Sequence, residues 1–207
     1  MSVSRKKYQL PTIAVLPVKI DLEKLKSETD KLAKKFVDVR TANPMLCMNH
    51  EELVKDVYDN FEQINLTTPS EILPHTTNIR ERLRRREEHL YNVPTEDYTG
   101  SYFEEIIKQF KSPASRIRIT KLEAGKTIPF HVDYDVDYAV RVIVPIYTSE
   151  KCINKFMVKG ECEEYNLKEG VPYFLNIGFK HSVENNNDSP RIALMFSLDG
   201  QDDLNTI

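Results

Sequence analysis

The sequence lacks the features that mark several common classes of protein. Its three cysteines are odd in number and show no CxxC spacing, which indicates free thiols in a reducing compartment, the cytoplasm, and no disulfide framework. No apolar run approaches the roughly 18 to 20 residues that span a bilayer. Pro11, Pro17 and Lys19 interrupt the apolar stretch near the N-terminus, so we do not expect a signal peptide. A cytoplasmic protein without a membrane span is therefore predicted.

The numbers of basic and acidic side chains are also nearly equal. The 29 basic and 32 acidic side chains give a formal charge of −3, which provides no general attraction to nucleic acid or anionic membranes. The sequence also has no internal repeat and no low-complexity linker. A length of 207 residues with 40% hydrophobic residues suits a substantial core, so we expect residues 1–207 to form a single domain.

The pattern of the chain changes near residue 112. Residues 1–112 are mostly helical in pattern, and we expect them to support a β core formed by residues 113–200. The elements expected in the first part are a strand within 12–20, a helix from Asp21 to about Phe36, a helix opened by a capping box of Asn49 and Glu52, and a helix after Ser101.

Strand-like runs follow Pro113, rich in β-branched and aromatic residues and separated by turn residues. They lie at 116–119, 139–147, 155–158, 171–177 and 192–198. Helices followed by several short strands predict an α+β fold with a mainly β core, built as an antiparallel sandwich or barrel.

The residues that could perform chemistry begin with His131 and Asp133. Positions i and i+2 of a strand face the same side, so both side chains could reach one ion. Taken alone, the pair fits a strand-end histidine before a polar turn better. His181 follows a strand-like run and the Gly178 turn, and alone it would be assigned to a surface turn. Together, two histidines and one carboxylate form the set that occupies one face of a non-haem iron and leaves other positions open.

Two arginines interrupt apolar β runs. Arg191 begins one run and Arg141 lies within another. A buried guanidinium is costly unless it is paired, and neither run contains an acid. One solution is an anionic ligand, since the planar guanidinium fork suits a carboxylate. The other is an acid from elsewhere in the fold, such as Asp135 or Asp137.

These motifs occur in the order found in a known family. The stretch from Arg116 to Gly200 resembles the aspartyl/asparaginyl β-hydroxylase family, and it is also similar to free-proline hydroxylases. The matching segments are RIRITKLEAGKTIPFHVDYD, the Arg141 strand ending in VPI, FMVKGECEEYNLKEG, YFLNIGFKHSVEN and PRIALMFSLDG.

The resemblance implies a double-stranded β-helix that uses Fe(II), 2-oxoglutarate and dioxygen to hydroxylate an unactivated C–H bond, with release of succinate and carbon dioxide. It implies that His131, Asp133 and His181 bind the iron and that Arg191 binds the distal carboxylate of 2-oxoglutarate. Arg141 would lie in the pocket and meet cosubstrate or substrate, with a structural role as the alternative.

The chain departs from the family pattern at two points. Some members lack the carboxylate ligand, whereas Asp133 is present here and favours hydroxylation over halogenation. The sequence contains no tryptophan, although the family pattern would place one near Tyr173, so the substrates of other members do not carry over. We expect a free amino acid or similar small acid as substrate, and a peptidyl Asp, Asn or Pro residue is the open alternative.

Two other functions fit parts of the sequence. A cupin-like scaffold could bind a metal or small acid without turnover, because a fold does not fix a function. The arginines of 80–86 could contact nucleic acid or close over an anionic substrate, but interleaved glutamates and the lack of an aromatic platform indicate a solvated helix or loop. We therefore expect no nucleic-acid partner. His50, His75 and His89 are interpreted as surface or capping residues.

Overall fold

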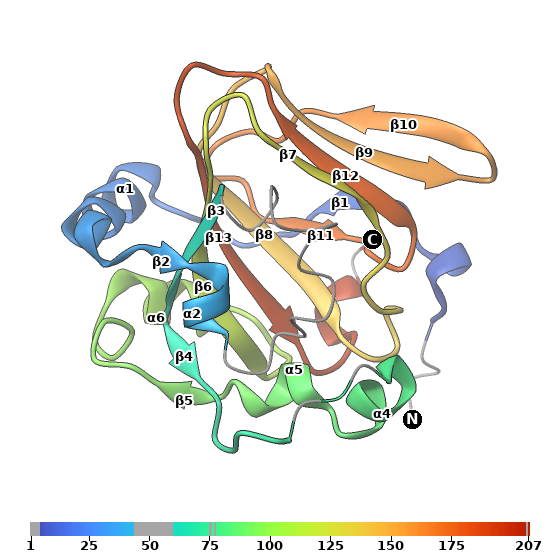
Figure 1. Cartoon of the computed structure of the whole chain (residues 1–207), viewed down its shortest axis with the longest axis horizontal. Helices are drawn as coiled ribbons and strands as arrows, with labels where there is room; N and C mark the ends of the chain where they lie inside the picture. The colour runs from blue at the N-terminus through green and yellow to red at the C-terminus, as the bar shows by residue number, and fades with distance from the viewer. Residues whose placement is uncertain (1–4, 44–59, 75, 77, 206) are drawn as a thin grey trace.

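Two facing β-sheets form the centre of the molecule (Figure 1). The computed structural model describes residues 5–43, 60–74, 76, 78–205 and 207. The larger sheet contains, in order, β1 (Ile13–Val15), β11 (Tyr173–Leu175), β8 (Val140–Tyr147), β13 (Arg191–Leu198), β6 (Ala114–Leu122), β3 (Phe61–Asn65) and β2 (Val37–Asp38). The smaller sheet contains β10 (Glu161–Tyr165), β9 (Cys152–Val158), β12 (Lys180–Asn185) and β7 (Thr127–His131).

The path of the chain through these sheets identifies the architecture. From β6 to β13 successive strands alternate between the larger and the smaller sheet, and only the β9–β10 hairpin stays within one sheet. All paired strands are antiparallel. This alternation is that of a double-stranded β-helix, so the predicted fold class, α+β with a mainly β core, is confirmed.

Period-two alternation divides the residues of the larger sheet between two hydrophobic clusters. On β8 and β13, Val142, Val144 and Leu194 pack in the cluster that includes residues of α1 (Leu22–Lys31) and α6 (Tyr102–Ile107). Ile143 and Ala193 face the opposite way and pack with residues of the smaller sheet. The same alternation directs three arginines toward the smaller sheet: Arg141 on β8, Arg191 on β13 and Arg118 on β6. The alternation therefore places three guanidinium groups between the two sheets.

The N-terminal half combines helices with strands. Among its described residues the helices are α1, α2 (Val39–Ala42), α4 (Ile79–Arg84), α5 (Glu87–Leu90) and α6, with 3-10 turns at Lys7–Gln9 and Ala33–Lys35. A further 3-10 turn, Asp202–Leu204, lies near the C-terminus. β1 confirms the strand expected within 12–20, whereas β2 and β3 extend the larger sheet beyond β6 in a part expected to be mostly helical. β4 (Thr67–Thr68) and β5 (Val93–Pro94) pair antiparallel in a separate two-stranded sheet, with α4 and α5 between them in the chain. The division near residue 112 into support and core stays a prediction.

Two of the expected helix starts are present. The Asp21 carboxylate accepts a hydrogen bond from the Lys24 backbone N–H at 3.1 Å, and Ser101 Oγ accepts one from Glu104 N–H at 3.4 Å. α1 ends at Lys31, earlier than the predicted Phe36, because the chain tightens into a 3-10 turn after Leu32. The helix expected after Asn49 lies outside the described residues. None of the described helices is long and apolar enough to cross a bilayer.

The cap of α1 allows a simple test of the N-terminal region. Replacing Asp21 with alanine removes the acceptor for an unpaired backbone N–H in the first turn, and we expect the free energy of unfolding to fall by about 1 kcal/mol. Urea unfolding followed by circular dichroism measures the change. The exposed Lys34→Ala, in the turn after the helix, is the control and should leave the midpoint unaltered. An unaltered midpoint for Asp21→Ala would contradict the assigned cap.

Candidate active site

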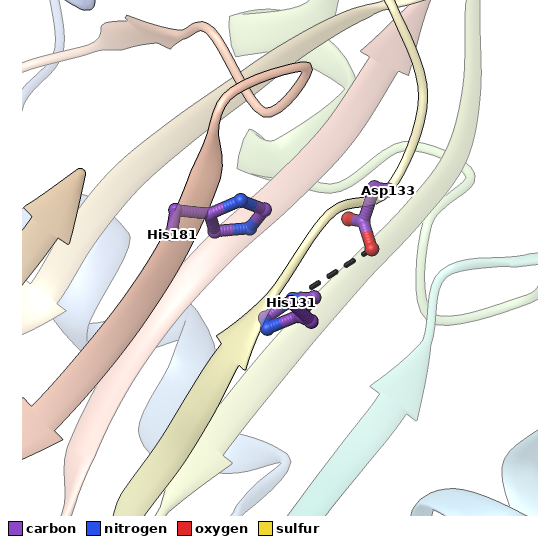
Figure 2. A group of neighbouring side chains, drawn as sticks. All are labelled: His131, Asp133 and His181. Carbon is purple, nitrogen blue, oxygen red and sulfur yellow. Dashed lines mark ion pairs between the residues drawn. The ribbon is translucent and has the colours of Figure 1, made fainter. Parts of the chain in front are cut away.

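Three side chains from two strands and a loop converge between the sheets (Figure 2). His131 is the last residue of β7, Asp133 lies in the loop that follows, and His181 lies on β12 directly opposite His131. One potential ligand atom from each residue lies within 4.8 Å of the other two. His131 Nε2 is 3.6 Å from Asp133 Oδ1, and the two imidazole rings are 4.2 Å apart between centroids. The three residues are therefore close enough together to hold one metal ion.

Backbone carbonyls set the orientation of both imidazoles. His131 Nδ1 lies 2.7 Å from the Pro129 carbonyl oxygen, and His181 Nδ1 lies 3.0 Å from that of Phe179. When Nδ1–H donates to a carbonyl, the lone pair of Nε2 is free, which is the usual arrangement of a metal-binding histidine. Phe156 stacks on the His181 ring, at 5.6 Å between centroids and 20° between planes, and restricts its rotation.

The protonation states of the cluster suit a cation. Burial, together with the nearby His131, lowers the pKa of His181 to about 4, so its imidazole is neutral at pH 7. Packing around Asp133 raises the pKa of its carboxyl group, but Arg141 and the two histidines outweigh this and hold it below its ordinary value. Asp133 is therefore a carboxylate at neutral pH. The donor set, two imidazoles and one carboxylate, fits Fe(II).

Arg191 is a buried cation with little to balance its charge. Its side chain begins β13, the residue is 4% exposed, and burial lowers the pKa of the guanidinium. Its hydrogen bond to a neutral partner, Asn154 Oδ1, is 3.4 Å long. Within the described part of the chain no carboxylate lies within ion-pair distance of it. An unpaired buried guanidinium is costly, and an anion entering between the sheets would offset that cost.

Arg141 has an internal acid partner, and the expectation that this acid is Asp135 or Asp137 is wrong. Arg141 Nη2 donates to Glu88 Oε1 at 3.1 Å and to the Tyr134 hydroxyl at 2.6 Å, and it lies 3.8 Å from Asp133 Oδ2. Asp135 and Asp137 lie in the loop before β8, where Asp135 accepts from the Lys7 backbone N–H and Asp137 pairs with Lys6. Both are directed toward the N-terminal segment and away from the site.

Glu88 is the main residue of this pocket that sequence reasoning missed. It is buried on α5, where Oε2 accepts from Arg116 at 2.7 Å and Oε1 accepts from Ser197 Oγ at 2.7 Å and from the Tyr134 hydroxyl at 3.0 Å. Burial raises the pKa of Glu88, but the charges of Arg116 and Arg141 outweigh this and hold it far below its ordinary value. In sequence, the residue is one of several glutamates interleaved with arginines, a pattern typical of a solvated helix.

The rest of this segment packs against the core more closely than expected. His89 is not a surface residue, because its side chain is only 10% exposed and its Nε2 lies 2.9 Å from the Tyr138 carbonyl oxygen. Several arginines of 80–86 pair with acids of the same chain: Arg82 with Glu87, Arg85 with Glu81, and Arg86 with Asp199. His50 and His75 lie outside the described residues.

Residues 92–199 match the sequence model of a family described as aspartyl/asparaginyl beta-hydroxylase. This match covers just over half of the chain. The chain belongs to that family. The aspartyl/asparaginyl beta-hydroxylase assignment confirms the predicted family and enzyme class, a 2-oxoglutarate-dependent non-haem iron dioxygenase. Glu88 and the arginines of 80–86 precede the matched segment.

Solved structures similar to this β-hydroxylase family member share little sequence with it. An oxidoreductase of the 2OG-Fe(II) oxygenase family from Burkholderia pseudomallei is 12% identical, with a TM-score of 0.45 over 83% of this chain and 76% of that one. Oxalate decarboxylase from Bacillus subtilis is 19% identical, with a TM-score of 0.35 over 44% of this chain and 23% of that one. A cupin domain from Bordetella pertussis is 17% identical, with a TM-score of 0.34 over 44% of this chain and 88% of that one. No curated protein matches the sequence. The family assignment rests on the match of residues 92–199.

Proposed function

We propose that this enzyme hydroxylates a C–H bond of a small amino-acid-like substrate, or of an Asp, Asn or Pro residue in a peptide, with Fe(II), 2-oxoglutarate and dioxygen. Succinate and carbon dioxide would be released with the product. The observation that supports this most strongly is that the His131, Asp133 and His181 cluster and the unpaired Arg191 share the interior of one double-stranded β-helix.

His131, Asp133 and His181 would hold the iron. Three protein ligands of this kind would leave other positions of the ion for the cosubstrate and dioxygen. Bound Fe(II) and 2-oxoglutarate supply the oxidising power, which no protein side chain can provide. The chain orients the two imidazole rings through the Pro129 and Phe179 carbonyls. His181 is already neutral, so it would not have to lose a proton when it binds the ion.

Arg191 would bind the distal carboxylate of 2-oxoglutarate. Its planar guanidinium can donate two parallel hydrogen bonds to a carboxylate, and Asn154 holds it from the smaller sheet. Ala193, the next inward-facing residue of β13, has a small side chain and is buried between the sheets.

Two further guanidinium groups support a substrate that contains a carboxylate. Arg118 Nη2 and Arg141 Nη1 both donate to the Met195 sulfur, at 3.3 and 3.0 Å. A thioether is a weak acceptor, and two cations directed at it would bind a carboxylate better. Arg118 and Arg141 lie toward the Ser197 end of β13, whereas Arg191 lies at the other end. Cosubstrate and substrate would therefore approach the metal from opposite sides.

Apolar side chains would keep bulk water from this reaction volume. Ile143, Phe156 and Leu175 are buried between the sheets and flank the inward-facing polar groups. A dry interior strengthens each charge interaction with a carboxylate and limits side reactions of the oxidant.

Buried Cys152 and exposed Cys162 are both free thiols, which supports the proposed cytoplasmic location.

The proposal is tested by supplying the purified chain with Fe(II), dioxygen and labelled 2-oxoglutarate and measuring labelled succinate. We expect turnover by the unaltered chain and a loss of more than about 100-fold in His131→Ala, since loss of an outer-shell partner alone costs 10- to 100-fold. Lys180→Ala is the control, because Lys180 is exposed and adjacent to His181 on β12.

Equal succinate production by the unaltered chain and His131→Ala would contradict the proposal. Bound metal without any succinate, even with candidate acids present, would indicate instead a module that binds a metal or small ligand without turnover.

A further inference from the structure

The charged side chains at the Ser197 end of β13, called the pocket here because the proposed function places the substrate among them, contain more positive than negative charge. Three guanidinium groups gather there, those of Arg116, Arg118 and Arg141, and they face the carboxylates of Glu88 and Asp133. One positive charge is therefore left over. Burial and the neighbouring arginines lower the pKa of Arg118 to about 9, in agreement with a crowded set of like charges.

Arg118 is the group whose charge is least balanced. Its side chain is 8% exposed, and its nearest carboxylate oxygen, in Glu88, is 4.0 Å away. Its hydrogen bonds go to the Arg116 carbonyl oxygen at 3.0 Å and to the Met195 sulfur. Arg116 and Arg141, in contrast, both bond directly to Glu88. The surplus charge therefore lies on the side of the pocket occupied by Met195.

Glu88 belongs to a part of the chain that the hydroxylase family match does not cover. Figure 1 shows α5 near the end of β13, and the hydrogen bond from Ser197 fixes Glu88 to that strand. Arg116, Tyr134 and Arg141 occupy its remaining acceptor positions. With every oxygen bonded, Glu88 acts as a permanent internal anion of the pocket.

We propose that Glu88 is a specificity-determining residue, which cancels one guanidinium charge so that the pocket accepts one substrate carboxylate at Arg118 and Arg141, and not two. The proposal rests on the function proposed above in one respect, that this pocket receives the substrate. The single carboxylate can belong to a free acid or to an acidic side chain in a peptide. A dicarboxylate would bring one unmatched negative charge into a buried site, which is costly.

Substitutions that change the charge step by step separate this role from a purely structural one. Glu88→Gln raises the surplus to two positive charges and keeps the shape of the side chain, whereas Glu88→Asp keeps the charge and shortens the side chain. Arg116→Met removes the surplus. The double variant Glu88→Gln/Arg116→Met restores it to one, and it also removes a guanidinium that would otherwise be buried without a partner.

Binding is measured by calorimetry on the metal-free full chain, in an Arg191→Met background that removes the other anion position. The probes are propionate and succinate, which carry one and two carboxylates. We expect propionate to bind more tightly than succinate with Glu88 present, and succinate to bind more than tenfold more tightly than propionate in Glu88→Gln. Glu88→Asp and the double variant should keep the preference for propionate. Arg116→Met should weaken both probes by more than tenfold, which provides a test even if Glu88→Gln does not fold.

Three results would overturn the proposal. The first is a folded Glu88→Gln variant whose ratio of succinate to propionate affinity is the same as with Glu88 present. The second is a ratio in Glu88→Asp equal to that in Glu88→Gln, and the third is no binding of either probe in any variant. The assay involves neither metal nor turnover, so its failure is distinct from failure of the succinate-formation test. Propionamide, which has no carboxylate, should not bind, and binding of propionamide as tight as that of propionate would also overturn the proposal. A short peptide with one aspartate and blocked termini carries a single carboxylate and should follow the preferences of propionate in the same variants.

Discussion

Replacing Arg191 with methionine should weaken the binding of 2-oxoglutarate and at the same time stabilise the metal-free fold. Truncating one partner of a buried charge pair costs about 2–5 kcal/mol, which is roughly 30- to 5000-fold in affinity. In the free protein the guanidinium is buried against only Asn154, and exchanging buried ionic groups for apolar side chains of similar volume often stabilises a protein by about 1–4 kcal/mol. We therefore expect lower affinity together with a higher Tm.

Calorimetric titration of 2-oxoglutarate into the metal-loaded chain without dioxygen measures the first effect, and thermal unfolding of the metal-free chain measures the second. A gain of 1 kcal/mol corresponds to about 2–4 °C in a protein of this size. Arg84→Met is the matched control, because Arg84 is exposed on α4, and it should alter neither quantity. Unchanged affinity in Arg191→Met, or a lower Tm, would show that Arg191 serves the fold and not the cosubstrate.

Replacing Glu88 with glutamine should have the largest effect on stability. The change leaves Arg116 and Arg141 buried without their acid, and breaking a buried ion pair in this way costs about 3–5 kcal/mol. The pKa of Glu88 is lower in the folded protein than its ordinary value of 4.5. Its stabilising contribution is therefore fully present at neutral pH and declines as the pH falls below 4.5, where the unfolded chain binds a proton that the folded chain does not.

Denaturant unfolding of the two proteins at pH 7 and at pH 3 checks both parts of this expectation. The difference in free energy of unfolding should be about 3–5 kcal/mol at pH 7 and smaller at pH 3. Glu105→Gln is the control, since Glu105 pairs with Lys24 on the surface, where an ion pair contributes about 1 kcal/mol or less. A difference that grows toward acid pH would have the wrong sign for a carboxylate of lowered pKa.

The local patterns of the sequence predicted the strands better than the pairs they form. Runs such as 139–147 alternate between two buried faces, and β8 follows that run almost residue for residue. β12, with the sequence KHSVEN, was not predicted, because only one of its six residues is clearly apolar. Its place between β7 and β9 is stabilised by backbone pairing on both sides, and that information lies in other strands.

The sequence predicted those site residues that lie close together along the chain. It did not predict the contacts between residues that only the folded structure brings together. His131 and Asp133 are two positions apart, whereas the register that sets His181 opposite His131 is a property of the folded sheet. Glu88 and Arg141 are 53 positions apart, and nothing in the local pattern distinguishes Glu88 from the other glutamates interleaved with arginines in its segment. Asp135 and Asp137 were closer to Arg141 in sequence, but the loop that contains them turns toward the N-terminal segment.

The most direct test is to locate a bound ion by anomalous diffraction from crystals grown with Fe(II) or Mn(II) under exclusion of dioxygen. We expect one ion per chain, bonded to Nε2 of His131, an oxygen of Asp133 and Nε2 of His181 at about 2.1 Å each, with its other positions held by water or 2-oxoglutarate. An ion bound elsewhere, or contacted by only two of these three side chains, would contradict the proposed iron site.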